Sequence, residues 1–270
     1  MTRATSGPAG ADAPGVPERV LVAIPTYNEK LTIETAVAGV RSAVPTAHVL
    51  VVDDGSPDGT GAIADALAAG DDHVHVMHRT QKQGLGAAYL AAFDWAFGRG
   101  YDAVVEMDAD GSHLPEQLPG LLAAMADPRV AVVLGSRWVP GGRIVNWPWH
   151  RVLLSRAGSL YSRLALGLSV RDVTGGYRVY RADVLRDLVA EGVESQGYCF
   201  QIDLVRRAVQ RRHRVVEVPI TFVERELGES KMSRSIVQEA MLRVTVWGFD
   251  RLTGRDRRRV RALARAGASS

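Results

Sequence analysis

Two pairs of carboxylates each follow an apolar run and have the spacing of a metal or polar-ligand site. Asp108 and Asp110 follow "DAVVEM", and Asp53 and Asp54 follow "HVLVV". Residues two apart in an extended segment point to the same side, so Asp108 and Asp110 present their carboxylates together. Two hard oxygen ligands suit Mg²⁺ or Mn²⁺, with phosphate oxygens and water completing the coordination. A capped turn before a helix near residue 115 is the alternative, but the second strand-end pair favours the metal.

The segment "DDGSPDGTGAIAD" allows two interpretations. From Asp54 it has the carboxylate, hydroxyl and glycine spacing of an EF-hand calcium loop, which would end at Asp65. Such a loop lies between two helices, whereas a strand-like run precedes Asp53. In addition, Pro57 restricts the loop, and Asp65 is shorter than the bidentate Glu of that position. A strand-to-helix turn in a nucleotide-binding sheet is therefore favoured.

Short β-branched runs alternate with helical patterns from residue 20 to residue 108. The runs are "VLVAI", "HVLVV", "HVHVM" and "DAVVEM", and the patterns between them are "NEKLTIETAVAGVRSA", "GTGAIADALAAG" and "GLGAAYLAAFDWAFGRG". This alternation predicts an α/β fold with a mostly parallel sheet covered by helices on both faces. We expect Asn28 to cap the first helix. Ligands gather at the carboxyl ends of parallel strands, so Pro25, Asp53, Asp54 and Asp108 should share one edge.

The composition is typical of a globular protein with anionic partners. The 270 residues are 46% hydrophobic and 23% charged, which is enough to bury a full core, and the net charge is +3. We expect phosphates or an acidic membrane as partners, and no nucleic acid. The lone cysteine, Cys199, excludes an internal disulfide and a thiolate metal cluster and is compatible with a reducing cytosol.

The chain is expected to hold one folded domain, residues 19–250, between two tails. Residues 1–18 are rich in Ala, Gly and Pro and predict a disordered leader. Residues 251–270 carry seven arginines and one aspartate, which predicts a solvated basic tail that can also bind anionic lipid. No apolar run approaches the roughly 20 residues that cross a bilayer.

Seven motifs between residues 20 and 250 occur in the order found in a known enzyme family. They are "PTYNE", "VVDDGSPDGT", "DADGSHLPE", "GSRWVPGG", "DVTGGYRVY", "GYCFQIDL" and "RELGESKM". This set resembles the dolichol- or polyprenol-phosphate mannosyltransferases, which are family 2 glycosyltransferases with a GT-A fold. The resemblance implies a GDP-mannose donor and a polyprenyl (dolichyl-type) monophosphate acceptor.

The resemblance also implies roles for individual residues. Pro25, Tyr27, Glu29, Val52 and Asp54 would hold the guanosine, Asp108, Ala109 and Asp110 would lie at the diphosphate, and Arg137, Arg225 and Lys231 would surround the phosphates. Asp108 and Asp110 are the expected metal ligands and, with Arg137 and Lys231, the expected catalytic residues. Ser112 stands where some family members have a metal-site Gln, so the third protein ligand stays open. Without the family pattern, the three cations would be interpreted as surface charges.

The implied acceptor determines the expected mechanism. A phosphate monoester has a second pKa of about 6, so at neutral pH it is mostly a dianion and needs no strong general base. We expect in-line attack on the anomeric carbon of mannose with inversion, while the metal and the cations neutralise the departing GDP.

Three alternatives accompany this hypothesis. One is a UDP-glucose-dependent polyprenyl-phosphate glucosyltransferase, and another is a non-catalytic protein that binds sugar nucleotides or lipids. The presence of Asp108, Asp110 and Lys231 together favours an enzyme. The third is a dehydrogenase, because "GLGAAYLAAF" hints at a dinucleotide fingerprint. That segment lacks the third glycine and is better explained as a helix packed on the sheet.

Residues 150–167 predict an amphipathic helix beside Trp147 and Trp149. Its apolar face comprises Leu153, Ala157, Leu160, Tyr161 and Leu164. Arg156 and Arg163 lie on its flank, which favours a helix in the membrane interface over one that faces the core. We therefore expect a peripheral protein at the cytoplasmic, inner face of the membrane. Many family members have C-terminal transmembrane helices and none is expected here, so a separate membrane-anchoring protein is a further expected partner.

Overall fold

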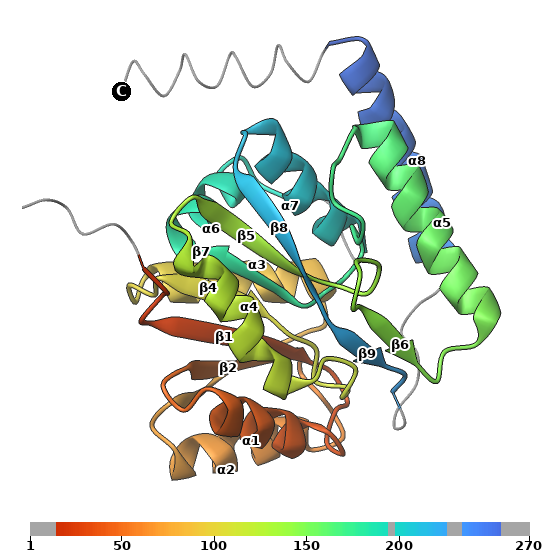
Figure 1. Ribbon diagram of the computed structural model, residues 1–270. Helices are drawn as coiled ribbons and strands as arrows, with labels where there is room; N and C mark the ends of the chain where they lie inside the picture. The colour runs from red at the N-terminus through yellow and green to blue at the C-terminus, as the bar shows by residue number, and fades with distance from the viewer. Residues whose placement is uncertain (1–14, 194–197, 226–233, 255–270) are drawn as a thin grey trace, which may run out of the picture.

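A seven-stranded sheet forms the centre of the protein in the computed structural model, which describes residues 15–193, 198–225 and 234–254 (Figure 1). Its strands are β1 Val20–Thr26, β2 His48–Asp53, β3 Val74–His78, β4 Ala103–Glu106, β5 Val130–Ser136, β7 Arg178–Arg181 and β8 Arg214–Pro219. They lie in the order β3-β2-β1-β4-β7-β5-β8, and β7 runs antiparallel to both β4 and β5. The predicted mostly parallel α/β sheet is confirmed.

Helices cover both faces of the sheet. They are α1 Ile33–Ala43, α2 Thr60–Gly70, α3 Leu85–Phe97, α4 Leu118–Ala123, α6 Ala182–Val189 and α7 Tyr198–Gln210, with short 3₁₀ turns at Pro115–Gln117 and Ala124–Ala126. Alternate side chains of β1 enter opposite cores, as the pleat of a strand requires. Leu21 packs in the core that contains Phe93 of α3 and Phe200 of α7, whereas Val22 packs in the core that contains Val37 of α1 and Leu118 of α4.

The turn before α1 differs from the sequence prediction. Asn28 does not cap α1, because the helix begins at Ile33 and its N-cap residue is Thr32. Asn28 has a φ of 59° and its backbone N–H donates to Ser56 Oγ at 3.0 Å. Asparagine tolerates this left-handed conformation, so the residue bends the chain out of β1 instead of starting the helix.

A small two-stranded sheet extends the molecule next to the end of β4. Its parallel strands are β6 Arg143–Val145 and β9 Thr221–Val223. An antiparallel bridge joins His113 to Phe222, and the N–H of Val223 donates to Ser112 O at 3.2 Å. These contacts bring the segment that follows β9 to the acidic residues that follow β4.

Two long helices, α5 Trp149–Leu166 and α8 Arg234–Leu252, lie side by side away from the sheet (Figure 1). They pack closely, since a Cβ at Gly248 would lie 3.3 Å from Ala165, and Tyr161 Oη lies 2.6 Å from Thr245 Oγ1. The sequence prediction gave no helix at α8. Residues 1–14 of the predicted leader and residues 255–270 of the predicted tail lie outside the described residues.

Several apolar residues of α5 are exposed, while Tyr161, Ala165 and Leu166 pack in or against the core. Leu153, Leu160 and Leu164 are 60%, 51% and 71% exposed, whereas Ser159 and Ser162 are buried. On α8, the exposed side chains include Leu242 at 67%, along with Met241, Val246, Phe249 and Leu252. A core-facing helix would show the reverse pattern. Most of the predicted apolar face of α5 is therefore exposed, and Tyr161 is the member of it that packs against the core.

Candidate active site

The carboxyl ends of β2, β1 and β4 are adjacent and bring the predicted donor residues to one edge of the sheet. Pro25 of β1 pairs with Val52 of β2, and β4 pairs with β1 on the other side. Asp53 ends β2, Asp54 follows it, and Asp108 lies two residues beyond β4. The predicted common edge is confirmed.

Three predicted donor residues differ in what they can present to a ligand. The side chain of Val52 is fully buried in the core, so this residue can offer only its backbone. Glu29 is 8% exposed and its Oε2 accepts a hydrogen bond from Thr32 Oγ1 at 3.2 Å. Tyr27 is half-buried, and Lys82 Nζ lies 4.0 Å from the centroid of its ring. Lys82 lies after β3, in a segment to which the sequence assigned no role.

Asp54 forms an ion pair with Arg79, which lies in the segment that follows β3. Arg79 Nη1 lies 2.6 Å from Asp54 Oδ1, and both side chains are largely buried. Burial raises the pKa of Asp54 above its ordinary value, although the charge and hydrogen bond of Arg79 oppose the shift. The segment after β3 therefore forms one wall of the donor edge.

The carboxylates of the calcium-like segment have separate partners. Asp53 is buried and accepts hydrogen bonds from Ser56. Asp58 Oδ1 accepts the N–H of Thr60, the first residue of α2, at 3.0 Å. Asp65 lies within α2 and pairs with His78 at 2.8 Å. A strand-to-helix turn thus replaces the calcium loop; the N-cap residue of α2 is Gly59, and Asp58 binds the first helical N–H from the position before it.

Asp108 and Asp110 lie in a turn that is held by its neighbours. The backbone N–H of Asp108 donates to His113 Nδ1 at 3.1 Å, and Asp110 Oδ1 accepts the N–H of Ser112 at 3.0 Å. Arg225 Nη2 lies 2.9 Å from Asp110 Oδ2, so this carboxylate already has a cationic partner. The side chain of Asp108 is 38% exposed, and that of Asp110 is 8% exposed.

His113 supports this turn as a neutral side chain. Burial lowers the pKa of His113 despite the opposing charges of Asp108 and Asp110, and its ring stacks on Tyr177. Its Nδ1 is therefore an acceptor for the backbone of Asp108. Among the described residues, no group of three or more His, Cys, Asp or Glu side chains is placed to hold a metal ion. Asp108 and Asp110 supply hard carboxylate oxygens that fit Mg²⁺ or Mn²⁺ when ligand oxygens complete the coordination.

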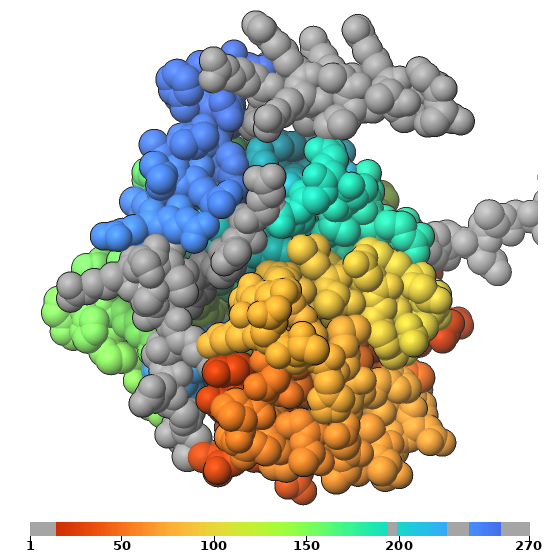
Figure 2. Space-filling view, turned by 180° about the vertical axis from the view of Figure 1, so that it is seen from behind, coloured from red at the N-terminus to blue at the C-terminus, as the bar shows by residue number. Residues whose placement is uncertain are grey.

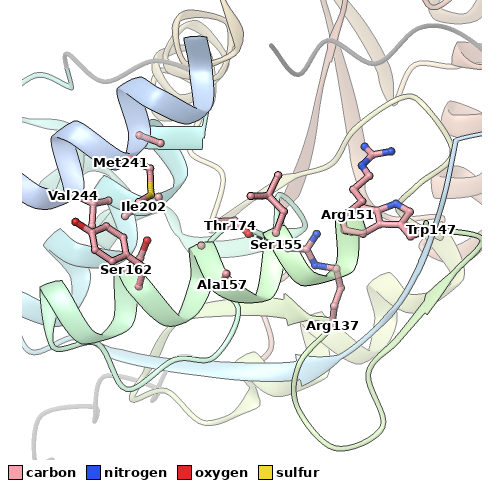
Figure 3. Close-up of a pocket in the computed structure, with 14 residues that line it drawn as sticks. Arg137, Trp147, Arg151, Ser155, Ala157, Ser162, Thr174, Ile202, Met241 and Val244 are labelled. Carbon is pink, nitrogen blue, oxygen red and sulfur yellow. Dashed lines mark hydrogen bonds between the residues drawn. The ribbon is translucent and has the colours of Figure 1, made fainter. Parts of the chain in front are cut away.

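A cavity of about 310 Å³ lies between α5, α7 and α8 (Figure 3). Its two ends differ in chemistry. Arg137, Arg151 and Trp147 lie at one end, whereas Ile202 and Val244 lie at the other. Cations at one end and an apolar interior suit a ligand with an anionic head and a hydrocarbon chain.

Both arginines of the cavity pair with a carboxylate. Arg137 Nη2 lies 2.7 Å from Asp172 Oδ1, and both side chains are buried. Arg151 forms an ion pair with Glu224, and its guanidinium carbon lies 4.6 Å from the centroid of the Trp147 ring. The guanidiniums are held in fixed places, so they present N–H donors at defined positions.

One loop, residues 171–177, connects the cavity to the donor edge. Thr174 of this loop lines the cavity and accepts a hydrogen bond from Arg137 Nη2 at 3.0 Å. Gly176 lies beside the acidic turn, since a Cβ there would be 3.2 Å from His113 Cε1 and 3.6 Å from Asp108 Oδ2. A side chain at position 176 would press on the acidic turn. The donor edge and the cavity therefore lie on either side of this one loop.

Residues 21–189 match the model of the family described as "Glycosyl transferase family 2". This match covers the donor edge, the acidic turn and α5. The chain belongs to glycosyl transferase family 2.

Curated members of this glycosyltransferase family are closely similar over most of their length. One is a polyprenol monophosphomannose synthase from Mycolicibacterium smegmatis, 58% identical over 86% of this chain and 88% of that protein. Another is an undecaprenyl-phosphate mannosyltransferase from Micrococcus luteus, 59% identical over 86% of this chain and 94% of that protein. The resemblance to polyprenol-phosphate mannosyltransferases is confirmed.

The fold also matches a solved glycosyltransferase structure. Glucosyl-3-phosphoglycerate synthase from Mycobacterium tuberculosis, solved with Mn²⁺, UDP-glucose and phosphoglyceric acid, superposes with a TM-score of 0.63. It is 21% identical, and the match covers 84% of this chain and 80% of that one. This similarity confirms the predicted GT-A fold.

The glycosyltransferase site contains residues that the sequence did not indicate. Of the cations predicted to bind the phosphates, Arg225 pairs with Asp110. Lys231, another of them, lies outside the described residues. Arg151, Glu224 and Asp172 were not predicted. A signal for Arg151 was its place directly after two tryptophans in "NWPWHR". Pairing with Glu224 joins segments 73 residues apart, so no local pattern indicates it.

Proposed function

We propose that this chain transfers mannose from GDP-mannose to a polyprenyl (dolichyl-type) monophosphate with inversion, giving polyprenyl-phosphate mannose. The observation that carries the proposal is the cavity whose cationic end adjoins the strand-end carboxylates and whose other end is apolar. The names of the two close relatives support a polyprenyl-phosphate acceptor and a mannosyl product.

The donor side would hold a nucleoside diphosphate sugar across the carboxyl ends of β1, β2 and β4. Tyr27 offers its ring to the nucleoside, and Glu29 and Asp54 offer carboxylate acceptors to base or ribose N–H and O–H groups. Arg225, now paired with Asp110, and Lys231 would contact the phosphates. Phosphate oxygens can take over a guanidinium from a carboxylate because both accept a bidentate pair of N–H bonds.

Asp108 and Asp110 would hold Mg²⁺ or Mn²⁺ at the diphosphate. Their oxygens are the ligands that these ions prefer, and the Arg225 contact places a positive charge at Asp110 even without an ion. When bound, the ion would neutralise the charge that develops on the departing diphosphate. A solved neighbour that contains Mn²⁺ supports this assignment.

The acceptor phosphate would lie between Arg137 and Arg151, with its prenyl chain along the apolar part of the cavity. One phosphate oxygen attacks the anomeric carbon as the bond from that carbon to the GDP oxygen breaks, and GDP leaves with the electron pair. The phosphate is already ionised at neutral pH, so no proton has to be removed first. The arginines therefore orient the nucleophile and do not activate it.

We further propose that α5 and α8 hold the protein at the cytoplasmic face of an anionic membrane. Within the described residues no helix has the length and hydropathy needed to cross a bilayer. Both helices carry exposed leucines, and α5 also carries the exposed Arg156, which matches an interfacial surface. A separate membrane-anchoring protein would compete for the same surface, and flotation of the purified chain with anionic liposomes distinguishes lipid from such a partner.

A donor competition assay tests the function directly. Radiolabelled GDP-mannose and UDP-glucose are offered separately with polyprenyl phosphate and Mg²⁺, and label is counted after extraction into organic solvent. The proposal predicts extractable label from GDP-mannose. UDP-glucose is the control donor because the structural neighbour was solved with it. Label from UDP-glucose alone would replace mannose by glucose in the proposed reaction.

A further inference from the structure

The loop that joins α5 to β7 anchors one of the two cavity arginines. Three N–H groups of Arg137 donate to the Asp172 carboxylate, from the backbone N at 2.9 Å, from Nε at 2.7 Å and from Nη2 at 2.7 Å. Burial by itself raises the pKa of Asp172, but the charge and hydrogen bonds of Arg137 outweigh it, so the pKa lies below the ordinary value. Asp172 is therefore an ionised anchor at neutral pH.

A second layer of contacts fixes Asp172 itself. Glu217 of β8 accepts the backbone N–H groups of Arg171 and Asp172 at 2.7 and 2.8 Å. On the other side of the loop, the fully buried Arg178 donates to the carbonyls of Val173 and Gly175 at 2.8 and 2.7 Å. The loop is thus held by the half-buried Glu217 carboxylate on one side and by the buried Arg178 guanidinium on the other.

The backbone of Arg137 is fixed as well. Gly142 folds back on it so closely that a Cβ at position 142 would lie 2.7 Å from Ser136 O and 2.8 Å from Arg137 O. The guanidinium carbon lies 5.4 and 5.5 Å from the ring centroids of Trp138 and Trp147. Backbone, carboxylate and rings together leave the guanidinium little freedom to turn.

Two other ion pairs of the site, Arg151–Glu224 and Arg225–Asp110, are more open to water. The side chains of Arg151 and Glu224 are 20% and 22% exposed, and Arg225 is 20% exposed in its pair with Asp110. Arg137 and Asp172 are 6% and 0% exposed. A ligand that approaches through the cavity can exchange with an accessible carboxylate, but it cannot reach Asp172 behind the guanidinium.

We propose that Asp172 is a positioning residue that fixes the Arg137 guanidinium at the cationic end of the cavity to receive the phosphate of a prenyl phosphate. The proposal rests on the assignment of the cavity to the acceptor. Asp172 itself does not touch the ligand, so its loss acts through Arg137 and on the phosphate alone.

The test is the binding of farnesyl phosphate and of farnesol, which lacks the phosphate, without any transfer reaction. Trp138 and Trp147 lie near Arg137, so intrinsic tryptophan fluorescence reports both ligands. Asp172→Asn keeps the shape of the side chain but removes its charge. We expect this variant to bind farnesyl phosphate about tenfold more weakly and to bind farnesol as the wild type does. The reason is that Arg137 contacts the phosphate, which farnesol lacks, through charge-assisted hydrogen bonds.

A double-mutant cycle with Arg137→Ala separates positioning from general damage. In the Arg137→Ala protein, Asp172→Asn should cause no further loss of farnesyl phosphate affinity, because contacting partners are not additive. Asp203→Asn is the matched control. Asp203 is an equally buried aspartate that pairs with Arg206 and Arg207 and does not line the cavity. We expect this control to bind farnesyl phosphate as the wild type does.

Glu217→Gln is the second variant, for the case that Asp172→Asn does not fold. It weakens the hydrogen bonds by which Glu217 holds the backbone of Arg171 and Asp172. It should lower farnesyl phosphate affinity in the same direction. Equal losses for farnesyl phosphate and farnesol, or independent effects in the cycle, would overturn the positioning role. The binding assay uses no sugar donor, so failure of mannose transfer would be seen separately.

Discussion

Two buried aspartates, one on each side of the site, pair with an arginine and have pKa values shifted in opposite directions. Asp54 at the donor edge pairs with Arg79 at 2.6 Å, and burial raises its pKa despite the opposing charge and hydrogen bond of Arg79. Asp172 at the cavity receives three N–H groups of Arg137, which lower its pKa. Burial raises the pKa of both carboxylates; at Asp172 the charge and hydrogen bonds of Arg137 outweigh burial, whereas at Asp54 those of Arg79 do not.

The two sides of the site also differ in exposure, because Arg225 in its pair with Asp110 is 20% exposed and Arg137 in its pair with Asp172 is 6% exposed. The donor carboxylates lie on turns directly after strands, and their cationic partners come from loops. The cavity arginine Arg137 is fixed by Asp172 and by the loop behind it. We infer that donor binding rearranges ion pairs on its side of the site. On the acceptor side, the Arg137 guanidinium is already in position before the ligand binds.

The largest expected effect is on the donor side. Asp110→Ala removes a predicted metal ligand and should reduce mannose transfer at least about 100-fold, because charge on the leaving diphosphate is no longer compensated. Initial rates with saturating acceptor measure the effect. Asp65→Ala is the control, since this carboxylate of the calcium-like segment pairs with His78. Near-normal turnover of the Asp110 variant would refute the metal assignment.

A smaller effect is expected at the cavity. Arg151→Ala should raise the KM for polyprenyl phosphate by about tenfold to a hundredfold through loss of a charge-assisted contact, with the KM for GDP-mannose unchanged. Steady-state kinetics in detergent, with each substrate varied in turn, provide both values. Arg163→Ala lies on the same helix outside the cavity lining and should leave both KM values unchanged. Parallel changes in both KM values would contradict a division into two sides.

Membrane binding should depend on the outer face of the cavity helices and not on the donor edge. Leu164→Glu combined with Phe249→Glu places charges on side chains that are 71% and 59% exposed. The double variant should lose flotation with anionic liposomes while retaining activity on a short prenyl phosphate in detergent. Leu31→Glu introduces a charge at another exposed leucine, near α1, and should float normally. Unimpaired flotation of the double variant would exclude this face as the contact.

The smallest expected effect is on stability at acid pH. The pKa of Asp172 is lower in the folded than in the unfolded chain, so its contribution is present above the ordinary aspartate pKa and is lost as pH falls. The pKa of Asp54 is raised, so its contribution falls as pH rises through the folded pKa. As the pH falls, the free energy of unfolding should therefore decrease less in Asp172→Asn than in the wild type, and more in Asp54→Asn. Urea unfolding from pH 3 to 7 measures these changes. If the two ion pairs were equivalent, the free energy of unfolding would change with pH equally in both variants.

The sequence predicted the donor edge better than the cavity for a physical reason. A strand and the turn that follows it are local, so apolar runs followed by "DDGS" and "DADGS" were sufficient to place Asp54 and Asp108 at one edge. Asn28 was misplaced because its left-handed conformation delays α1 to Ile33. The helical period showed the apolar stripe of α5, but a period alone does not say whether the stripe faces core or solvent.

The cavity depends on contacts between distant segments. Arg137 and Asp172 are 35 residues apart, and Arg151 and Glu224 are 73 residues apart. Within one helix the pairs are short-range, as where Asp203 of α7 pairs with Arg206 and Arg207. The family resemblance supplied Arg137 and Arg225, because only an ordered set of motifs carries information across such separations.

Filling the cavity tests the central claim that the prenyl chain lies between α5 and α8 while the donor binds at the strand ends. Gly158 of α5 lines the cavity, and a Cβ there would meet nothing within 4 Å, so Gly158→Phe can occupy the space without a backbone clash. Gly120→Phe in α4 is the control, because a Cβ there also meets nothing within 4 Å. The account predicts that Gly158→Phe binds GDP-mannose normally but fails to mannosylate a long-chain polyprenyl phosphate. Transfer at the rate of the Gly120 control would contradict it.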